Sequence, residues 1–251
     1  MLHADCCPHG PIIADLITLT IKMVRRWLTD LMLFLFPANC LVCGSRLPVP
    51  VDVLCPGCEY RLPRTGYSDR ENNPVNMIFW GRVQLAGATS LLWFEKGSVY
   101  QSMLHELKYR NNCKTGLYLG KLLGHELKST RLALCDMIIP VPLHPRKRKQ
   151  RGYNQAELIA IGTSRITGIP VETGILLRIL HHDSQTGMGR YERYENVAGN
   201  FKLAPGARDL TDTSILLIDD IVTTGATLEA CSITLLQRYR CQVYIATVSC
   251  A

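Results

Sequence analysis

Apolar and polar residues alternate along the chain with two different periods. Short runs with the apolar character of strands occur at 83–94, 137–141, 214–218 and 243–248. Patterns with an apolar residue at every third or fourth position, typical of helices, occur at 119–127, 154–166 and 227–239. Strands that alternate with helices predict an α/β domain over residues 83–251, with an open, mainly parallel sheet flanked by helices.

Residues 1–36 are predicted to form an N-terminal extension with an amphipathic helix. Its apolar positions fall on one helical face and are Ile13, Leu16, Ile17, Val24, Trp27, Leu28 and Leu31. Charged residues interrupt every window long enough to cross a bilayer, so no transmembrane segment is predicted. No basic segment precedes the first apolar run, so no signal peptide is predicted either. Two interpretations stay open for this helix: packing on the rest of the protein, or association with a membrane surface.

The composition is globular and the charge is basic. Of the 251 residues, 47% are apolar and 20% are charged, and the net charge is +7. This balance favours anionic partners such as nucleotides, diphosphates or nucleic acid, which charge alone does not separate. Seven of the eleven cysteines are scattered, several of them in apolar runs. This pattern argues against a secreted disulfide scaffold and favours a reducing cytoplasm.

The other four cysteines stand in two close pairs within a segment rich in Pro, Gly and Cys, residues 37–66. The pairs are Cys40/Cys43 and Cys55/Cys58. Two such turns brought together offer four thiolates to one structural, tetrahedral zinc ion. The alternative is a thioredoxin-like redox pair, but that chemistry uses a single pair at the start of a helix. We therefore expect a zinc-binding module over 37–66, followed by a polar, turn-rich linker over 67–82.

Two acids, Asp219 and Asp220, follow the strand predicted at 214–218, and a hydroxyl-rich turn then leads into a helix. The turn consists of Val222, Thr223, Thr224, Gly225, Ala226 and Thr227. Backbone N–H groups, the helix dipole and the threonine hydroxyls of such a turn can hold a dianionic 5-phosphate. The two carboxylates can accept hydrogen bonds from ribose hydroxyls or hold a metal ion through water. The alternative is an acidic turn in which Thr223 or Thr224 caps the helix.

A basic segment follows the strand predicted at 137–141, where a parallel sheet presents a second ligand-binding loop. A diphosphate with its magnesium ion would balance this charge, since arginine can hold phosphate oxygens with two parallel hydrogen bonds. The candidate diphosphate-binding residues are Arg146, Lys147, Arg151, Tyr153 and Asn154. Two alternatives stay open: a solvated charged surface, above all at Lys147 and Lys149, or a patch that binds nucleic acid.

The acid-pair turn closely resembles the fingerprint of type I phosphoribosyltransferases, and further motifs resemble one family. In chain order, these are the two cysteine pairs, Leu107-Lys108-Tyr109, Pro140-Val141-Pro142-Leu143, Arg151-Gly152-Tyr153-Asn154-Gln155, and Gln185-Thr186-Gly187 with Arg193, Asn196-Val197 and Phe201. Together with the acid pair they are similar to the competence protein F (ComF) family over residues 34–251. The resemblance implies a type I phosphoribosyltransferase-like fold, an N-terminal zinc-binding module and a link to the uptake of transforming DNA in some bacteria.

The resemblance also implies that residues 180–201 form a loop that closes over phosphoribosyl diphosphate (PRPP). Its candidate residues are Gln185, Thr186, Arg190, Arg193 and Asn196. Polar residues flanked by glycine suit a lid that opens and closes. The alternative is a plain surface hairpin, because long polar loops are often only solvated.

These features lead to a hypothesis of PRPP binding and magnesium-dependent transfer of the phosphoribosyl group to an unidentified acceptor, with release of diphosphate. Asp219 and Asp220 are the candidate catalytic residues, and no residue stands out as a general base for the acceptor. An alternative from a different class is an inactive adaptor that senses PRPP or binds single-stranded DNA and works with competence proteins. A third is a salvage or regulatory PRPP-binding protein unrelated to DNA.

Overall fold

We describe the protein from a computed structural model of the chain. It describes residues 38–48, 51, 53–68, 70–95, 97–109, 113–179 and 200–251, together with isolated positions nearer the N-terminus. The chain divides into two compact units, residues 1–55 and 56–251. The N-terminal extension predicted at 1–36, with its amphipathic helix, lies outside the described residues except for four isolated positions. The predicted domain boundaries remain predictions.

The larger unit contains a parallel sheet with the strand order β1-β6-β5-β2 in its described part. The strands are β1 Gly87–Trp93, β2 Met137–Pro140, β5 Ser214–Val222 and β6 Gln242–Cys250. All three pairings between them are parallel. The strands are nearly continuous runs of buried residues, as expected of a sheet with both faces covered. The predicted α/β fold with an open, mainly parallel sheet is confirmed.

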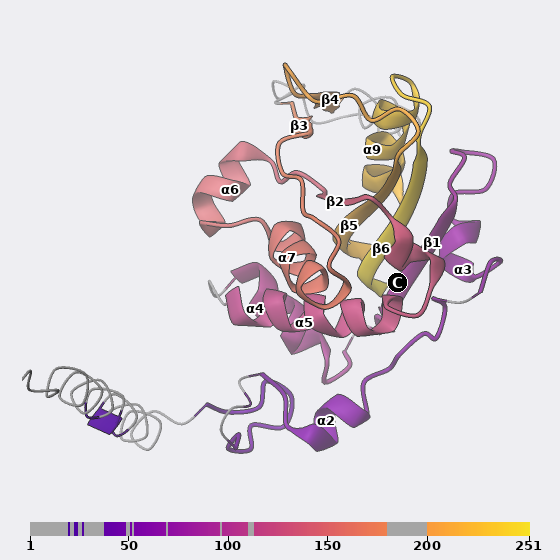
Figure 1. Cartoon of the computed structure of the whole chain (residues 1–251). Coiled ribbons are helices and arrows are strands. Elements are labelled where there is room, and N and C mark those ends of the chain that lie inside the picture. The colour runs from indigo at the N-terminus through magenta and orange to yellow at the C-terminus, as the bar shows by residue number, and fades with distance from the viewer. Residues whose placement is uncertain are drawn as a thin grey trace, which may run out of the picture. The chain divides into compact units, whose positions relative to one another are not determined.

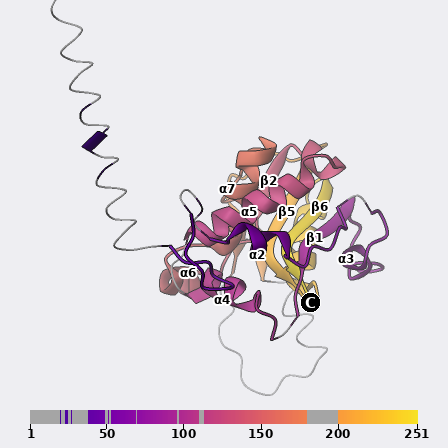
Figure 2. The ribbon, with the colours of Figure 1, turned by 90° about the horizontal axis from the view of Figure 1, so that it is seen from below.

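Helices cover both faces of this sheet (Figures 1 and 2). The helices of the described residues are α2 Pro56–Tyr60, α3 Pro74–Met77, α4 Gln101–Tyr109, α5 Cys113–Leu127, α6 Pro145–Arg151, α7 Gln155–Thr167 and α9 Ala226–Leu236, with a 3₁₀ turn at Arg131–Leu134. Ile215 and Leu217 of β5 share one core with Leu228 of α9. The alternate residues Leu216 and Ile218 are buried on the opposite face, where α5 and α7 pack.

Close backbone contact fixes α7 against α5. A Cβ atom on Gly120 of α5 would lie 2.1 Å from the carbonyl oxygen of Ile159, and one on Gly162 of α7 would lie 2.3 Å from that of Leu117. Only glycine therefore permits the two helices to approach so closely. The contact also sets where the first residues of α7 lie, and these residues contribute to the candidate site.

The strand β5 runs to Val222, although the sequence predicted a strand that ends at Ile218. It continues because β6 extends to Cys250 and supplies partners along its whole length. Asp219 is paired with Thr247, and Val222 with Cys250. The two acids thus lie in the last part of the strand, so the sheet fixes their backbone.

Residues 67–82, whose polar composition predicted a linker, pack into the larger unit. Asn73 caps α3 by accepting from the N–H groups of Val75 at 2.9 Å and Asn76 at 3.0 Å. Its Nδ2 atom donates to the carbonyl oxygen of Ala88 in β1 at 2.8 Å. Val75 and Phe79 are both 1% exposed and belong to the core that contains α9. This segment therefore contributes directly to the structure around the acid-pair turn.

Candidate functional site

A cavity of about 320 Å³ lies at the carboxyl ends of β2 and β5, which are neighbours in the sheet. Its walls come from the two segments that the sequence singled out and from one further strand. They include Asp219, Asp220, Thr223 and Thr227 from β5 and its turn, Lys147, Arg151, Asn154 and Gln155 from the segment after β2, and Arg178. The carboxyl edge of a parallel sheet is where such folds bind ligands. The structure therefore brings both candidate segments to one cavity.

The turn after β5 enters α9 at a glycine. Gly225 is the N-cap residue, with a φ of 75°, and no side chain caps the helix. The alternative in which Thr223 or Thr224 caps α9 is therefore not what the structure shows. Both threonines are exposed, Thr227 and Ala226 are half-buried, and Val222 is buried. The hydroxyl groups are thus placed at the open side of the turn, next to the positive end of the helix dipole.

Gly225 also packs against a distant segment of the chain. A Cβ atom at this position would lie 2.7 Å from Cγ2 of Ile78 and 2.8 Å from Cε1 of Phe79. The residue is therefore fixed by packing as well as by its positive φ.

Arg82 connects the same turn to α9, and no pattern in the sequence singles it out. Its guanidinium donates to the carbonyl oxygen of Ile78 at 3.0 Å, to that of Thr224 at 2.7 Å, and to the carboxylate of Glu229. Glu229 lies in the first turn of α9, and its side chain is 5% exposed. Arg82, which lies outside this strand–turn–helix unit, thus holds the turn in place.

Asp219 and Asp220 are both half-buried, and the backbone N–H of Asp220 donates to Oδ1 of Asp219 at 2.8 Å. Neighbouring residues of a strand point to opposite faces. Asp219 lies two positions after Leu217, which shares a core with Leu228 of α9, so it is on the α9 face of the strand. Burial raises the pKa of the Cys231 thiol in α9, and the negative charge of Asp219 raises it further. The positive charge of Arg178 lowers the same pKa.

The basic segment forms the helix α6 rather than a loop. His144 caps it by accepting from the N–H of Arg146 at 3.2 Å, Pro145 is its first residue, and Gly152 ends it with a φ of 77°. Lys147 and Arg151 are one helical turn apart and both border the cavity. Arg148 does not border the cavity and forms an ion pair with Glu157, with N–O 3.5 Å. Arg146 and Lys149 are exposed and are not among the residues of the cavity wall.

The two other candidates of this segment have structural partners. Tyr153 donates from its hydroxyl to the carbonyl oxygen of Leu107 at 2.8 Å, which ties it to α4. Asn154 borders the cavity, caps α7 through the N–H of Ala156 at 3.2 Å, and donates to the carbonyl oxygen of Val141 at 3.0 Å. Asn154 therefore connects the start of α7 to the residue that follows β2.

Gln155 and Arg178 border the cavity, although the sequence singled out neither as a ligand-binding residue. Gln155 directly follows Asn154 in the same motif, so its neighbourhood was a usable signal. Arg178 ends the short strand β3, Leu176–Arg178, and its guanidinium lies 5.3 Å from the ring centroid of Phe201. No local pattern predicts that position, because it depends on the pairing of β3 with β4.

The strands β3 and β4, Phe201–Leu203, form an antiparallel pair that brackets residues 180–199. The N–H of Ile179 donates to the carbonyl oxygen of Asn200 at 2.7 Å. The candidate lid residues Gln185, Thr186, Arg190, Arg193 and Asn196 lie outside the described residues. Arg178, the last residue of β3, borders the cavity, so this strand pair contributes to the cavity wall.

A second cavity, of about 400 Å³, lies at the opposite edge of the sheet, near the starts of β1 and β6. Its walls include Gly87 and Tyr244 and an ion pair between Arg131 and Glu71, with N–O 2.8 Å. None of the candidate residues borders it.

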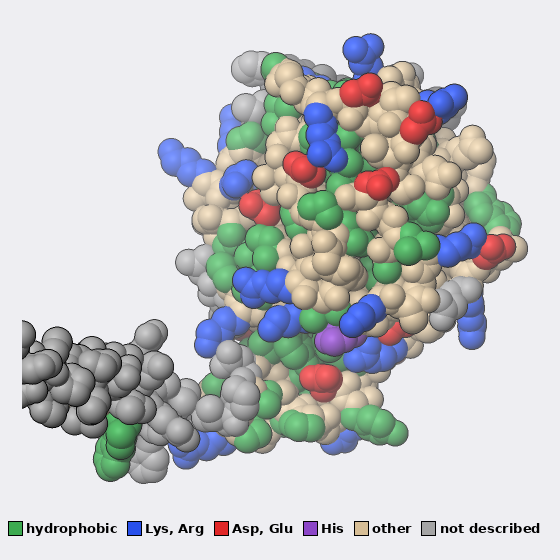
Figure 3. Space-filling view, in the orientation of Figure 1, with side chains coloured by type: hydrophobic (Ala, Val, Ile, Leu, Met, Phe, Trp, Pro, Cys, Tyr) green, Lys and Arg blue, Asp and Glu red, His purple; other side chains and the backbone are tan. Residues whose placement is uncertain are grey.

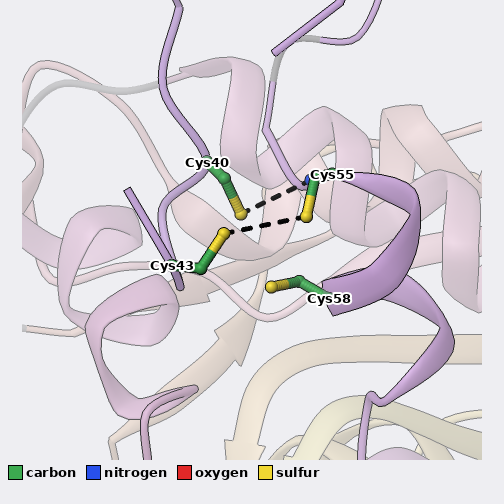
Figure 4. A group of neighbouring side chains, drawn as sticks. All are labelled: Cys40, Cys43, Cys55 and Cys58. Carbon is green, nitrogen blue, oxygen red and sulfur yellow. Dashed lines mark hydrogen bonds between the residues drawn. The ribbon is translucent and has the colours of Figure 1, made fainter. Parts of the chain in front are cut away.

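The four paired cysteines form one cluster, in which the sulfur atoms lie within 4.8 Å of one another. Figure 4 shows Cys40, Cys43, Cys55 and Cys58 with their sulfurs turned towards a common centre. The Sγ atoms of Cys43 and Cys55 are 3.7 Å apart. Four thiolates around one zinc ion at about 2.3 Å would stand about 3.8 Å from one another. The four cysteines therefore fit a tetrahedral metal ion.

The backbone around the first pair forms a tight turn. The N–H of Gly44 donates to the carbonyl oxygen of Cys40 at 2.9 Å, and Gly44 has a φ of 71°. The N–H of Cys55 points at the sulfur of Cys40, at 3.4 Å. The second pair differs from the predicted turn, because Gly57 lies inside α2, which begins at Pro56. Only Gly44 is therefore required by its conformation.

Basic side chains on the face shown in Figure 3 are interspersed with acidic ones rather than gathered in one patch. No helix among the described residues is long and apolar enough to cross a membrane.

The fold and the two sites define an α/β protein with a candidate anion-binding cavity at the carboxyl edge of its sheet and a four-cysteine candidate metal centre. Known proteins are similar to this chain in sequence. Competence protein F of Haemophilus influenzae is 28% identical over 217 residues, which cover 80% of this chain and 92% of that protein. The DNA utilization protein YhgH is 29% identical in Salmonella typhimurium and 28% in Escherichia coli K12, over 129 residues. These 129 residues are 50% of this chain and 56% of YhgH.

The similarities confirm the resemblance to the competence protein F family that the motifs indicated. No protein-family model matches the chain. Among solved structures, a glutamine PRPP amidotransferase from B. subtilis, complexed with ADP and GMP, has 20% identity and a TM-score of 0.37 over 55% of this chain and 26% of its own. Adenine phosphoribosyltransferase from Leishmania tarentolae has 13% identity and a TM-score of 0.36 over 60% of this chain and 74% of its own.

Proposed function

We propose that the cavity between β2 and β5 binds PRPP and that the protein transfers the phosphoribosyl group to an acceptor, with release of diphosphate. The supporting observation is that the acid pair, the hydroxyl-bearing turn and two cations of α6 border one cavity. Each of these groups suits a different part of PRPP. Two other cavities, one near the starts of β1 and β6 and one lined by Pro140, Arg148 and Glu157, do not combine them.

In this proposal the turn holds the 5-phosphate. Thr223 and Thr227 border the cavity and can donate their hydroxyls. The start of α9 adds backbone N–H groups and a partial positive charge, which favours an anion without a basic side chain. Arg82 and Phe79 support the turn from behind, so it is shaped before the ligand arrives.

Asp219 and Asp220 would accept hydrogen bonds from the ribose hydroxyls, and Lys147 and Arg151 would face the diphosphate. A magnesium ion bound with PRPP would neutralise diphosphate charge as the leaving group departs. In the reaction, the bond between C1 and the diphosphate oxygen breaks and a lone pair of the acceptor forms the new bond to C1. The acceptor's proton passes to water or to the departing diphosphate. The roles of the candidate lid residues remain predictions.

We also propose that the four-cysteine cluster holds a structural zinc ion. All four thiolates would be used, which leaves no open position for a substrate. Action in the reducing cytoplasm, which the cysteine pattern of the sequence favours, is part of the same proposal.

The test is a calorimetric titration of PRPP with magnesium into the wild type and the double variant Asp219→Asn/Asp220→Asn. The variant removes two charges from the cavity, and we expect PRPP binding to be abolished while the fold and the zinc content stay intact. The matched control is Asp209→Asn/Asp212→Asn, which removes two charges from carboxylates outside the cavity. Retained affinity in the first variant would refute the proposal. Release of diphosphate with a panel of bases and amines then tests catalysis separately.

A second candidate function is an adaptor that senses PRPP or binds single-stranded DNA and acts with competence proteins. The observation that favours it is that only some of the cations of α6 border the cavity. Lys147 and Arg151 border the cavity, while the exposed Arg146 and Lys149 do not. A helix with cations outside the ligand site can contact a phosphate backbone. The names of the relatives, a competence protein and a DNA utilization protein, point in the same direction.

The two candidates differ in which lysine matters. Lys149→Gln would weaken salt-sensitive binding of single-stranded DNA and leave PRPP affinity unchanged if the adaptor proposal holds. Lys147→Gln would weaken both, since its side chain borders the cavity. DNA binding that is absent from the wild type at low salt would remove the DNA-binding form of the adaptor.

A further inference from the structure

A buried amide in the wall of the cavity has no hydrogen-bond partner. Gln155 is the first residue of α7, is 3% exposed and borders the cavity. Its Nε2 atom finds no partner among the described residues. Buried polar groups are nearly always paired in folded proteins. An unpaired donor next to a cavity therefore indicates that a bound ligand supplies the acceptor.

The surroundings of this donor identify the kind of acceptor. An amide NH₂ group only donates, so the ligand must present an oxygen or another acceptor atom. Three cations, Lys147, Arg151 and Arg178, border the same cavity. The first residues of α7 border it too, and the positive end of a helix dipole favours negative charge. An anionic oxygen fits all of these groups.

The side chain of Gln155 is not needed to hold the start of α7 in place. Asn154 supplies the cap by accepting from the N–H of Ala156, and it anchors the helix to the carbonyl oxygen of Val141. The amide of Gln155 therefore performs no capping that the helix would lose. This separates a ligand-binding role of the side chain from a structural one.

We infer that Gln155 donates from Nε2 to a diphosphate oxygen of the bound ligand. Gln155 is then a specificity-determining residue, which favours PRPP over ribose 5-phosphate because only PRPP carries the diphosphate. The inference rests on the proposed function, since it takes PRPP as the occupant of the cavity. It adds an uncharged donor to the basic residues that border the same cavity.

The experiment replaces Gln155 by Met, which has a similar volume and no donor. Calorimetric titrations use PRPP with magnesium, diphosphate with magnesium, and ribose 5-phosphate. We expect the Kd for PRPP and for diphosphate to rise about tenfold, and the Kd for ribose 5-phosphate to stay unchanged. The thermal midpoint of the unliganded variant should be equal or higher, since a buried donor without a partner is removed. Gln155→Glu, which places a carboxylate there, should lose more affinity than the Met variant.

The matched control is Gln242→Met, at the exposed start of β6 on the opposite edge of the sheet. It should change none of the three affinities. Unchanged PRPP affinity in both Gln155 variants would overturn the inference. If the thermal midpoint of Gln155→Met also falls, the side chain has a structural role only. A loss that includes ribose 5-phosphate would also overturn the diphosphate assignment. If the wild type binds no PRPP, the proposed function fails, while the diphosphate titrations still test Gln155 on their own.

Discussion

Arg82 and Glu229 form an ion pair between two segments that lie 147 positions apart in the sequence. Arg82 follows α3, and Glu229 lies in the first turn of α9. The same guanidinium donates to the carbonyl oxygen of Thr224 at 2.7 Å. The turn proposed to bind phosphate is thus positioned by a residue from outside the strand–turn–helix unit. A pairing of this kind couples the stability of the fold to the shape of the site.

Arg82→Met should lower both stability and PRPP affinity. The Glu229 side chain is 5% exposed, so the loss of its partner leaves a buried charge and costs about 3 kcal/mol of unfolding free energy. The turn also loses its bond to Thr224, and we expect PRPP affinity to fall about tenfold. Urea unfolding and calorimetric titration measure the two effects.

Glu229→Gln separates these two effects. It removes the buried charge but leaves Arg82 bonded to Thr224, so PRPP affinity should stay near that of the wild type. Added to Arg82→Met, it should restore part of the lost stability because no unpaired carboxylate remains. A loss of PRPP affinity in Glu229→Gln equal to that in Arg82→Met would contradict the positioning role of Arg82, and a double variant less stable than Arg82→Met would contradict the unpaired-charge argument.

Local patterns were sufficient for much of this protein. The helical face of Leu119, Leu122, Leu123 and Leu127 is buried in α5, and the predicted helix from Asn154 is α7, with Asn154 as its cap. The acid pair near the end of β5 and the cysteine pairs could also be identified, because each is a contiguous or closely spaced motif. Short-range periodicity and spacing do not need knowledge of distant contacts.

The features that the sequence did not reveal depend on distant partners or on a competing signal. Arg82 and Phe79 act through contacts with the turn after β5, far away in the sequence. The helix α6 occupies a segment whose place after a strand predicts a ligand-binding loop, although Pro145 at its start and Gly152 after its end are helix-boundary signals. Lysine and arginine are good helix formers, so a run of charge is compatible with a helix.

Gly225→Ala should be more destabilising than its φ of 75° alone explains. A left-handed conformation costs a non-glycine residue about 1–2 kcal/mol. The added Cβ would also lie within 2.8 Å of Ile78 and Phe79 atoms, so the turn must shift and PRPP affinity should fall. The matched control is Gly206→Ala, with a φ of 74° and no atom within 4 Å of its Cβ. Equal losses of stability in the two variants would show that packing at Gly225 contributes nothing.

Buried thiols should make the protein less stable above pH 9. Burial, helped by the charge of Asp136, raises the pKa of Cys135 from 9.0 to about 12. Burial also raises the pKa of Cys231, Cys241 and Cys250. A group whose pKa is raised in the folded state contributes its full stability below the unfolded pKa and loses it as the pH rises towards the folded pKa. Cys135 alone should cost about 1.4 kcal/mol of unfolding free energy between pH 8 and pH 10.

Urea unfolding at pH 8, 9 and 10 measures this slope. Cys135→Ala removes one titrating thiol, so its stability should fall less steeply than that of the wild type over the same range. Its stability at pH 8 should be somewhat lower because a buried side chain is shortened. Parallel slopes for the two proteins would show that Cys135 ionises as freely in the folded state as in the unfolded one.

Metal analysis of the purified protein should find about one zinc ion per chain. The four sulfurs lie within 4.8 Å of one another, and deprotonated thiolates so close together repel each other unless a cation is bound. Cys40→Ser should therefore abolish zinc binding, since it replaces one of only four ligands and leaves three thiolates. Cys113→Ser is the matched control, because Cys113 is an exposed, free cysteine outside the cluster. A chain without zinc, or equal zinc loss in both variants, would contradict the assignment.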